Sequence, residues 1–279
     1  MTFTHDVEAA GEILRLGSVA VLTGAGVSTD SGIPDYRGPN AVAREPMTYQ
    51  EFLAGSAHRS RYWARNQVGW HHLLRAVPNA SHCVLARVEA AGKIRGIITQ
   101  NIDRLHQRAG SFSVVDLHGR YDQVLCMQCR SLIPRSTWGQ LLDQANPDFV
   151  WRSEDPADID FAPDADADIQ YDGDYVVPDC PVCGGVVKPN VVFFGESAGP
   201  DDVAHAAAVV DASRAVLVLG SSLTVYSGRR FVRRALRHNK PVVIVNRGQT
   251  RSDTDASIKI DAGVAEFLGA VEPLWSHGM

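Results

Sequence analysis

Two loops of the sequence carry polar side chains directly after short apolar runs. Gln100, Asn101 and Asp103 follow the run at residues 97–99, and His118 follows the run at residues 114–117. An imidazole has an unperturbed pKa of about 6.5, so at neutral pH it can accept a proton as a general base. A lone histidine is more often a structural hydrogen-bonding residue, and from this pattern alone both roles of His118 stay open.

A glycine-rich turn lies near the N-terminus. The apolar run at residues 19–22 leads directly into Thr-Gly-Ala-Gly-Val-Ser at residues 23–28. Glycines let the backbone approach a pyrophosphate, and the amides of such a turn supply partial positive charge. The pattern departs from the dinucleotide fingerprint because Thr29 replaces its third glycine. A tight strand-to-helix turn without a ligand is the alternative.

The next segment, residues 31–37, reads Ser-Gly-Ile-Pro-Asp-Tyr-Arg. It combines a proline-fixed turn with an acid, an aromatic ring and a cation, and it leaves no room for a regular helix. This composition predicts a shaped loop that covers a bound ligand. A dehydrogenase that only transfers hydride would not need such a loop.

Four of the five cysteines form two Cys-x-x-Cys pairs, Cys126 with Cys129 and Cys180 with Cys183. Two such pairs suit a tetrahedral zinc site, and the glycines after the second pair permit a tight turn. Four protein ligands leave no position for an activated water, so the predicted zinc is structural. Redox-active pairs are the alternative. Cys83 is expected to be a small, buried apolar residue of a helix.

Five apolar runs recur along the chain, at residues 19–22, 97–99, 114–117, 215–219 and 242–245. The stretches between them are long enough for helices, so the alternation predicts an α/β fold with a mostly parallel sheet and helices on both faces. Ligands of open parallel sheets bind at the carboxyl ends of the strands. Residues 38–80 and 120–189 interrupt this rhythm and are predicted to be insertions that form a smaller domain.

The composition excludes several classes of protein. The chain has 279 residues, with 27 basic and 32 acidic side chains and a net charge of −5, so nucleic acid is not expected as a partner. No apolar run is long enough to span a bilayer, and no signal peptide is visible at the N-terminus. Paired cysteines without a secretory signal favour a reducing, cytoplasmic location.

Two clusters of charge have a simple interpretation. Residues 152–179 hold ten acidic side chains against Arg152 alone, which predicts a solvated loop. An EF-hand is rejected, because Ile169 and Tyr175 stand where its glycine and glutamate belong. Five arginines share one predicted helix and indicate either a solvated face or a partner surface: Arg229, Arg230, Arg233, Arg234 and Arg237.

Taken together, these residues resemble the sirtuin family over residues 15–270. The motifs occur in sirtuin order: residues 24–28, 32–37, 99–103, His118-Gly119, the two cysteine pairs, Phe194-Gly-Glu196, Gly220-Ser-Ser222 and Asn246. Residues 62–66 and 225–228 are similar to the class II subgroup, which includes a mitochondrial member of lipoamidase and ADP-ribosyltransferase type and many bacterial ones.

The resemblance implies a Rossmann-like large domain, residues 1–37, 81–119 and 190–279, and a small zinc-binding domain, residues 38–80 and 120–189. NAD and an acyl-lysine peptide would enter between them. The implied catalytic residues are His118, Asn101 and Asp103. The implied NAD contacts are Gly24, Ala25, Gly26, Ser28, Thr29, Ile33, Asp35, Tyr36, Arg37, Gln100, Asn101, Ile102, Asp103, His118, Gly220, Ser221, Ser222, Asn246, Arg247, Gly248 and Val264. The implied peptide contacts are Val192, Phe193, Phe194, Gly195, Glu196 and Val225.

The activity implied by the resemblance is NAD-dependent removal of acyl groups from protein lysines. Nicotinamide would leave, the lysine amide oxygen would capture the ribose, and His118 would deprotonate a ribose hydroxyl so that the acyl group passes to ADP-ribose. Mono-ADP-ribosyl transfer to protein is the second enzymatic interpretation. A non-catalytic, NAD-sensing zinc protein is the third.

Two departures from the family pattern bear on specificity. Tyr36 stands where most relatives have phenylalanine, which adds a hydroxyl to the loop over the nicotinamide. Relatives that remove acidic acyl groups carry Tyr-x-x-Arg in a small-domain helix, where this chain has Asn66 and Gly69. Desuccinylation is therefore not expected, and the preferred acyl group stays open.

Overall fold

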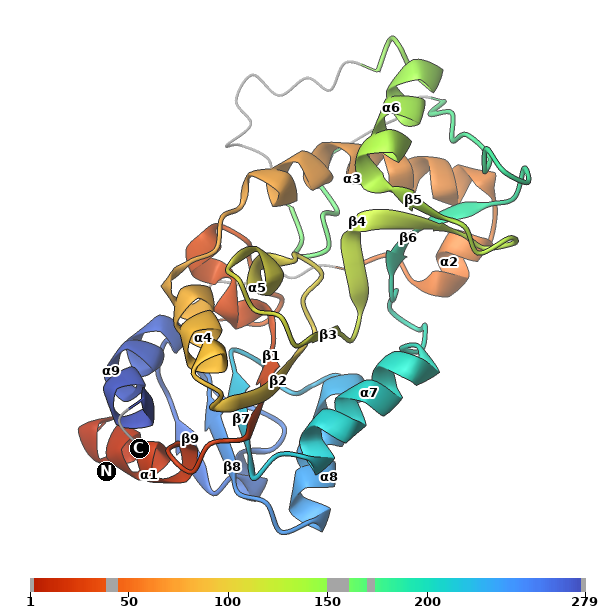
Figure 1. Cartoon of the computed structure of the whole chain (residues 1–279). Helices are drawn as coiled ribbons and strands as arrows, with labels where there is room; N and C mark the ends of the chain where they lie inside the picture. The colour runs from red at the N-terminus through yellow and green to blue at the C-terminus, as the bar shows by residue number, and fades with distance from the viewer. Residues whose placement is uncertain (1–2, 39–44, 150–160, 170–173, 277–279) are drawn as a thin grey trace.

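The computed structural model describes residues 3–38, 45–149, 161–169 and 174–276. The described residues form a six-stranded sheet and a separate three-stranded sheet. The two sheets, each with its own helices, lie at opposite ends of the molecule (Figure 1). We call them the large and the small unit.

The sheet of the large unit is parallel throughout, with the order β3-β2-β1-β7-β8-β9. Its strands are β1 (Val19–Thr23), β2 (Ile94–Thr99), β3 (Val114–Asp116), β7 (Ala215–Leu219), β8 (Val242–Val245) and β9 (Ile258–Ile260). Five of these strands coincide with the predicted runs, and β9 is an additional one. The predicted fold class, a Rossmann-like, doubly wound α/β sheet, is confirmed.

The unbroken apolar character of the central strands follows from their burial on both faces. In β1, Val19 and Val21 belong to one hydrophobic core, and Ala20 and Leu22 belong to the core on the opposite face. Every residue of β1 is buried. Side chains alternate between the two faces of a strand, so a strand covered on both sides has no position that faces solvent.

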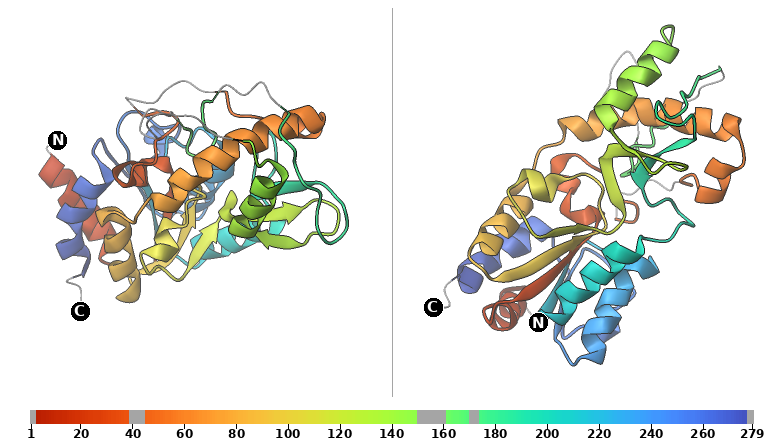
Figure 2. Two further views of the ribbon diagram at one scale, coloured as in Figure 1. Left: turned by 90° about the horizontal axis from the view of Figure 1, so that it is seen from above. Right: turned by 45° about the vertical axis from the view of Figure 1, so that its right-hand side comes forward.

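Helices cover both faces of this sheet (Figure 2). One face packs against α1 (Phe3–Leu14), α4 (Ala80–Ala90) and α9 (Val264–Ser276). The other packs against α7 (Pro200–Asp211) and α8 (Tyr226–Arg237). The predicted arginine helix is α8, in which Arg234 pairs with Asp211 of α7, with 2.6 Å from its Nε to Oδ1. A short helix, α5 (Leu105–Arg108), follows β2.

The sheet and helices of the small unit come from residues 49–75 and 119–191. Its antiparallel sheet consists of β4 (Gly119–Cys126), β5 (Leu132–Pro134) and β6 (Val187–Val191), in the order β5-β4-β6. Its helices are α2 (Tyr49–Leu53), α3 (Ser56–Arg75) and α6 (Arg135–Ala145), and the rings of Trp63 and Trp138 meet in its core. Residues 39–44 of the first insertion lie outside the described residues. Among the described helices, none combines the length and apolar composition needed to cross a membrane.

Part of the acidic segment differs from the predicted solvated loop. Residues 150–160 and 170–173 lie outside the described residues, but residues 161–169 pack against α3. Ala162, Ala165 and Ala167 are buried, and Arg65 of α3 donates from Nε to Asp166 Oδ1 at 2.6 Å. The alanines that alternate with the acids explain the difference, because they give this segment an apolar side.

Candidate active site

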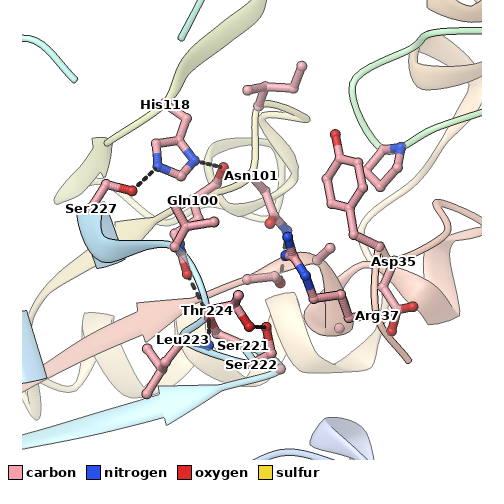
Figure 3. Close-up of a pocket in the computed structure, with 18 of the residues that line it drawn as sticks. Asp35, Arg37, Gln100, Asn101, His118, Ser221, Ser222, Leu223, Thr224 and Ser227 are labelled. Carbon is pink, nitrogen blue, oxygen red and sulfur yellow. Dashed lines mark hydrogen bonds between the residues drawn. The ribbon is translucent and has the colours of Figure 1, made fainter. Parts of the chain in front are cut away.

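A cavity of about 1390 Å³ lies at the carboxyl ends of β1, β2, β7 and β8. Its walls come from both units, because Gly24 and His118 line it together with Tyr62 of α3 and Phe193. Ligands of open parallel sheets bind at this edge. Figure 3 shows the polar side chains that converge there.

The glycine turn after β1 lies directly against the loop after β7. A Cβ atom on Gly24 would be 2.7 Å from the carbonyl oxygen of Gly220, and one on Gly26 would be 2.8 Å from the Gly220 Cα. The Gly26 amide donates to that same oxygen at 2.9 Å. Only glycine permits this contact. Two single 3-10 turns follow, at residues 25–27 and 29–31, rather than a regular helix.

Hydrogen bonds join this turn to the loop after β2. Asn101 donates from Nδ2 to the Gly24 carbonyl at 3.1 Å and to Ser28 Oγ at 3.0 Å. Ser28 in turn donates to Asp103 Oδ2 at 2.7 Å, while Asp103 Oδ1 accepts from the Leu105 amide at 2.9 Å. The buried Asp103 thus has partners on both oxygens, and its contacts fix the amide of Asn101 at the cavity wall.

His118 has partners on both ring nitrogens (Figure 3). Its Nδ1 lies 3.0 Å from the Gln100 carbonyl oxygen, which can only accept, so Nδ1 carries the hydrogen. Burial lowers the pKa of His118, which keeps the ring neutral and leaves Nε2 as an acceptor. Ser227 at the start of α8 donates to Nε2 at 2.7 Å. The imidazole is therefore held in the tautomer that a general base requires.

Gln100 links His118 to the loop after β7. Its side-chain Oε1 accepts from Ser221 Oγ at 2.7 Å, while its backbone oxygen accepts from His118. One residue thus connects the strand-end loops of β2, β3 and β7.

The predicted lid segment, residues 31–37, lies over the cavity, and Asp35, Tyr36 and Arg37 all line it. Asp35 Oδ1 accepts from the Gly38 amide at 2.8 Å and closes a turn. The ring of Tyr36 packs edge-on against Phe194 at a centroid distance of 5.7 Å. Burial and the neighbouring carboxylate of Asp164 raise the pKa of Tyr36 well above its usual value, so the hydroxyl keeps its proton.

The predicted peptide segment, residues 192–196, begins beside the histidine. The Val192 amide donates to the His118 carbonyl at 2.8 Å. Glu196 accepts from the Phe193 amide at 3.0 Å and pairs with the buried ammonium of Lys188 at 2.8 Å. The carboxylate of Glu196 therefore holds the segment in place through the Phe193 amide and Lys188, and Glu196 also lines the cavity.

The far end of the cavity lies near β8 and the start of α9. Asn246 follows β8, and its amide donates to the Ile260 carbonyl of β9 at 3.1 Å. Gly248, in the left-handed region at φ 78°, donates to Asp261 Oδ1 at 3.1 Å. Val264, at the start of α9, is buried and lines the same end.

The structure brings the predicted ligand-binding residues together around this one cavity. All of them line it except Ser28, which lies behind the wall and contacts Asn101 and Asp103. Their roles toward NAD and peptide stay predictions. Sequence reasoning missed Ser227 as a partner of His118, and it missed Tyr62 and Asp164 as wall residues. No local signal marks these residues, because each reaches the cavity from a distant segment.

The four paired cysteines lie away from this cavity, in the small unit. Their Sγ atoms all lie within 4.8 Å of one another, with 3.5 Å between Cys126 and Cys183 and 3.8 Å between Cys129 and Cys180. Four thiolates at about 2.3 Å from a tetrahedral zinc would stand about 3.8 Å apart. The cluster therefore fits zinc. Cys83, the fifth cysteine, lies in α4 as predicted, but it is half-buried rather than buried.

Comparison with known proteins identifies the family. Residues 24–227 match the Sir2 family. The chain belongs to the Sir2 family, the sirtuins. It is 48% identical to "NAD-dependent protein deacetylase 1" of Mycobacterium avium (strain 104), over 93% of each chain. It is 49% identical to the protein of the same name from Streptomyces coelicolor, over 96% of this chain and 89% of that one.

Solved sirtuin structures have the same fold. The structure described as "Sir2-p53 peptide-NAD+" superposes with a TM-score of 0.75 at 32% identity, over 94% of this chain and 95% of that chain. "Structure of Sir2Tm bound to a propionylated peptide" superposes with a TM-score of 0.70 at 30% identity, with the same coverage.

The contact between Ser227 and His118 predicts a measurable effect on the pKa of the imidazole. The hydroxyl donates to the lone pair of the neutral ring, so removing it in Ser227→Ala destabilises the neutral form. We expect the pKa of His118 to rise by about 0.5 to 1. An NMR titration of the labelled imidazole measures this change in the free protein. Ser197→Ala removes an exposed hydroxyl of the same cavity and should leave the titration unchanged; an equal effect of both substitutions would contradict the assignment.

Proposed function

We propose that this sirtuin is an NAD-dependent protein-lysine deacylase that transfers the acyl group to ADP-ribose and releases nicotinamide. The observation that carries the proposal is the hydrogen-bonded connection of three loops around one cavity: the glycine turn, the Asn101 loop and His118. The relatives named as NAD-dependent protein deacetylases support it.

In this proposal NAD lies along the cavity in the order of its wall residues. The backbone amides of the glycine turn contact the phosphates, and Asn246 to Gly248 with Val264 contact the adenosine half. Asn101 and Asp103 line the nicotinamide pocket under the lid of residues 31–37. The acyl-lysine peptide adds a strand beside residues 192–196, with Val225 on its other side.

The chemistry expected of the chain follows from these positions. Bound NAD supplies the leaving nicotinamide and the ribose that receives the acyl group. The lid and the rings of Tyr36 and Phe194 exclude water, which would otherwise compete with the lysine amide oxygen for the ribose. His118 Nε2 exchanges the Ser227 hydroxyl for a ribose hydroxyl and accepts its proton, while Nδ1 stays anchored on Gln100.

The zinc ion has a separate, structural part in the proposal. Cys126, Cys129, Cys180 and Cys183 would hold it at the hairpin of β4 and β5 and at the loop before β6. A metal there would link the two cysteine pairs, which lie 50 residues apart in the chain, and would stabilise the folded state. Free thiolates persist in a reducing compartment, so a cytoplasmic location stays our prediction.

Replacing the base tests the proposed reaction. His118→Ala removes the group that accepts the ribose proton, and we expect kcat for release of O-acetyl-ADP-ribose from an acetyl-lysine peptide to fall by about 10²- to 10⁴-fold. Mass spectrometry of the products measures this ester. His205→Ala replaces an exposed histidine of α7 and should retain full activity. Ribosylated protein in place of the ester would favour ADP-ribosyl transfer, and full activity of His118→Ala would refute the role of the imidazole.

Removing zinc tests the metal site. We expect about one zinc per chain by elemental analysis, and prolonged chelation should remove it and lower Tm by about 10 °C or more, because binding stabilises only the folded state. Cys180→Ser should give the same loss without a chelator. Cys83→Ser lies outside the cluster and should retain the metal. A zinc-free protein of unchanged Tm would contradict the structural role.

A further inference from the structure

The acidic segment sends one carboxylate into the wall of the cavity. Residues 161–169 form a compact loop in which Phe161 and Ala167 pair across an antiparallel bridge. The ring of Phe161 lies 3.6 Å from the ring of His72, centroid to centroid, and Asp166 pairs with Arg65. Two contacts with α3 thus hold the loop in place.

A glycine of α3 makes this approach possible. A Cβ atom on Gly69 would lie 2.2 Å from the carbonyl oxygen of Ala165, so any other residue would push the loop away. Gly69 is buried under the loop, against Ala165, which directly follows Asp164 in the chain. The glycine at position 69 therefore determines how closely the loop that carries Asp164 approaches α3.

Asp164 lines the cavity, and its carboxylate interacts with the hydroxyl of Tyr36 and with the backbone amides of Asp164 and Asp166. Its Oδ1 is buried and has no hydrogen-bond partner among the described residues. A buried acceptor without a partner costs free energy, on the order of 1–3 kcal/mol. Burial and the nearby Asp166 raise the pKa of Asp164 to about 6, so it is mainly ionised at pH 7.5. The wall thus contains an anionic carboxylate, one oxygen of which is buried and without a partner among the described residues.

Two tyrosines place this acceptor relative to the peptide segment. The ring of Tyr36 packs on Phe194, and the ring of Tyr62 packs on Phe193 at a centroid distance of 5.2 Å. Both tyrosines are close enough to Asp164 for its charge to raise their pKa values. Asp164 therefore lies behind the rings beside which the acyl-lysine side chain enters. The cavity wall also includes the apolar side chains of Ile33, Met47, Ile102 and Val191.

We propose that Asp164 determines acyl specificity by accepting a hydrogen bond from acyl groups that carry a donor, such as 3-hydroxybutyryl, and by repelling carboxylated acyl groups such as succinyl. The proposal rests on the deacylase function proposed above. A site that leaves a buried polar group unpaired with the wrong ligand discriminates strongly, whereas an apolar wall discriminates weakly. Plain acyl groups would leave Asp164 Oδ1 unpaired, and a hydroxyl would satisfy it.

Matched peptides that differ by one hydroxyl test the proposal. We expect kcat/KM of the wild-type protein for 3-hydroxybutyryl-lysine, in its better enantiomer, to exceed that for butyryl-lysine by about tenfold, and succinyl-lysine to be the poorest substrate. In Asp164→Ala the ratio should fall to about one. Calorimetry of the two peptides without NAD should show the same preference in Kd.

Two variants near Asp164, Asp168→Asn and Tyr36→Phe, serve as controls, and Asp164→Asn is a further test. Asp168→Asn changes an exposed acid of the same loop and should keep the wild-type ratio. Tyr36→Phe removes the hydroxyl bound to Asp164 and should keep or increase the preference, because the carboxylate loses a competing donor. Asp164→Asn removes the charge at nearly constant shape and should improve the use of succinyl-lysine.

The outcomes separate this proposal from the one on which it rests. A wild-type ratio near one, or an unchanged ratio in Asp164→Ala, overturns the role of Asp164 while deacetylation continues. Absence of NAD-dependent deacetylation in the wild-type protein refutes the deacylase function itself. If Asp164→Ala does not fold, the wild-type ratio and the Asp164→Asn variant still decide the question.

Discussion

The contact between the backbones of Gly26 and Gly220 sets the geometry on which the rest of the site depends. β1 and β7 are neighbours in the sheet. The hydrogen bond of 2.9 Å from the Gly26 amide to the Gly220 carbonyl joins the loops that follow these strands. With the two loops fixed, Ser221 reaches Gln100, and Gln100 orients His118. A side chain on either glycine would separate the loops, and the imidazole would lose its anchor through Gln100.

The sequence predicted those parts of the molecule that depend on local pattern. Strands buried on both faces leave apolar runs, glycine turns and cysteine pairs have fixed spacing, and polar residues at strand ends share one edge of the sheet. Ser227, Tyr62 and Asp164 could not be found in this way, because their contacts with His118, Phe193 and Tyr36 join segments far apart in the chain. β9, with three residues, is too short to show a periodicity.

Helix α3 shows how one element serves both the core and the cavity. Tyr62 faces the cavity, Asn66 lies behind it and accepts from the buried Arg135 at 3.1 Å, and Gly69 lies under the loop of residues 161–169. Arg135 stacks on Trp70, with its guanidinium carbon 4.5 Å from the ring centroid. The positions where relatives specific for acidic acyl groups carry tyrosine and arginine are thus used here for packing. Arg135 therefore lies in the core rather than in the cavity wall.

The cavity therefore has two polar ends of different character. At one end a neutral imidazole is held by donors and acceptors that are all satisfied, which suits a group that must exchange one partner for a ribose hydroxyl. At the other end the carboxylate of Asp164 keeps one buried oxygen unpaired among the described residues, in a loop that packs against α3. Between them lie the rings of Phe193, Phe194 and Tyr36. In the proposed function, an acyl-lysine in this cavity would meet both ends: its amide would reach the ribose beside His118, and its acyl chain would approach Asp164.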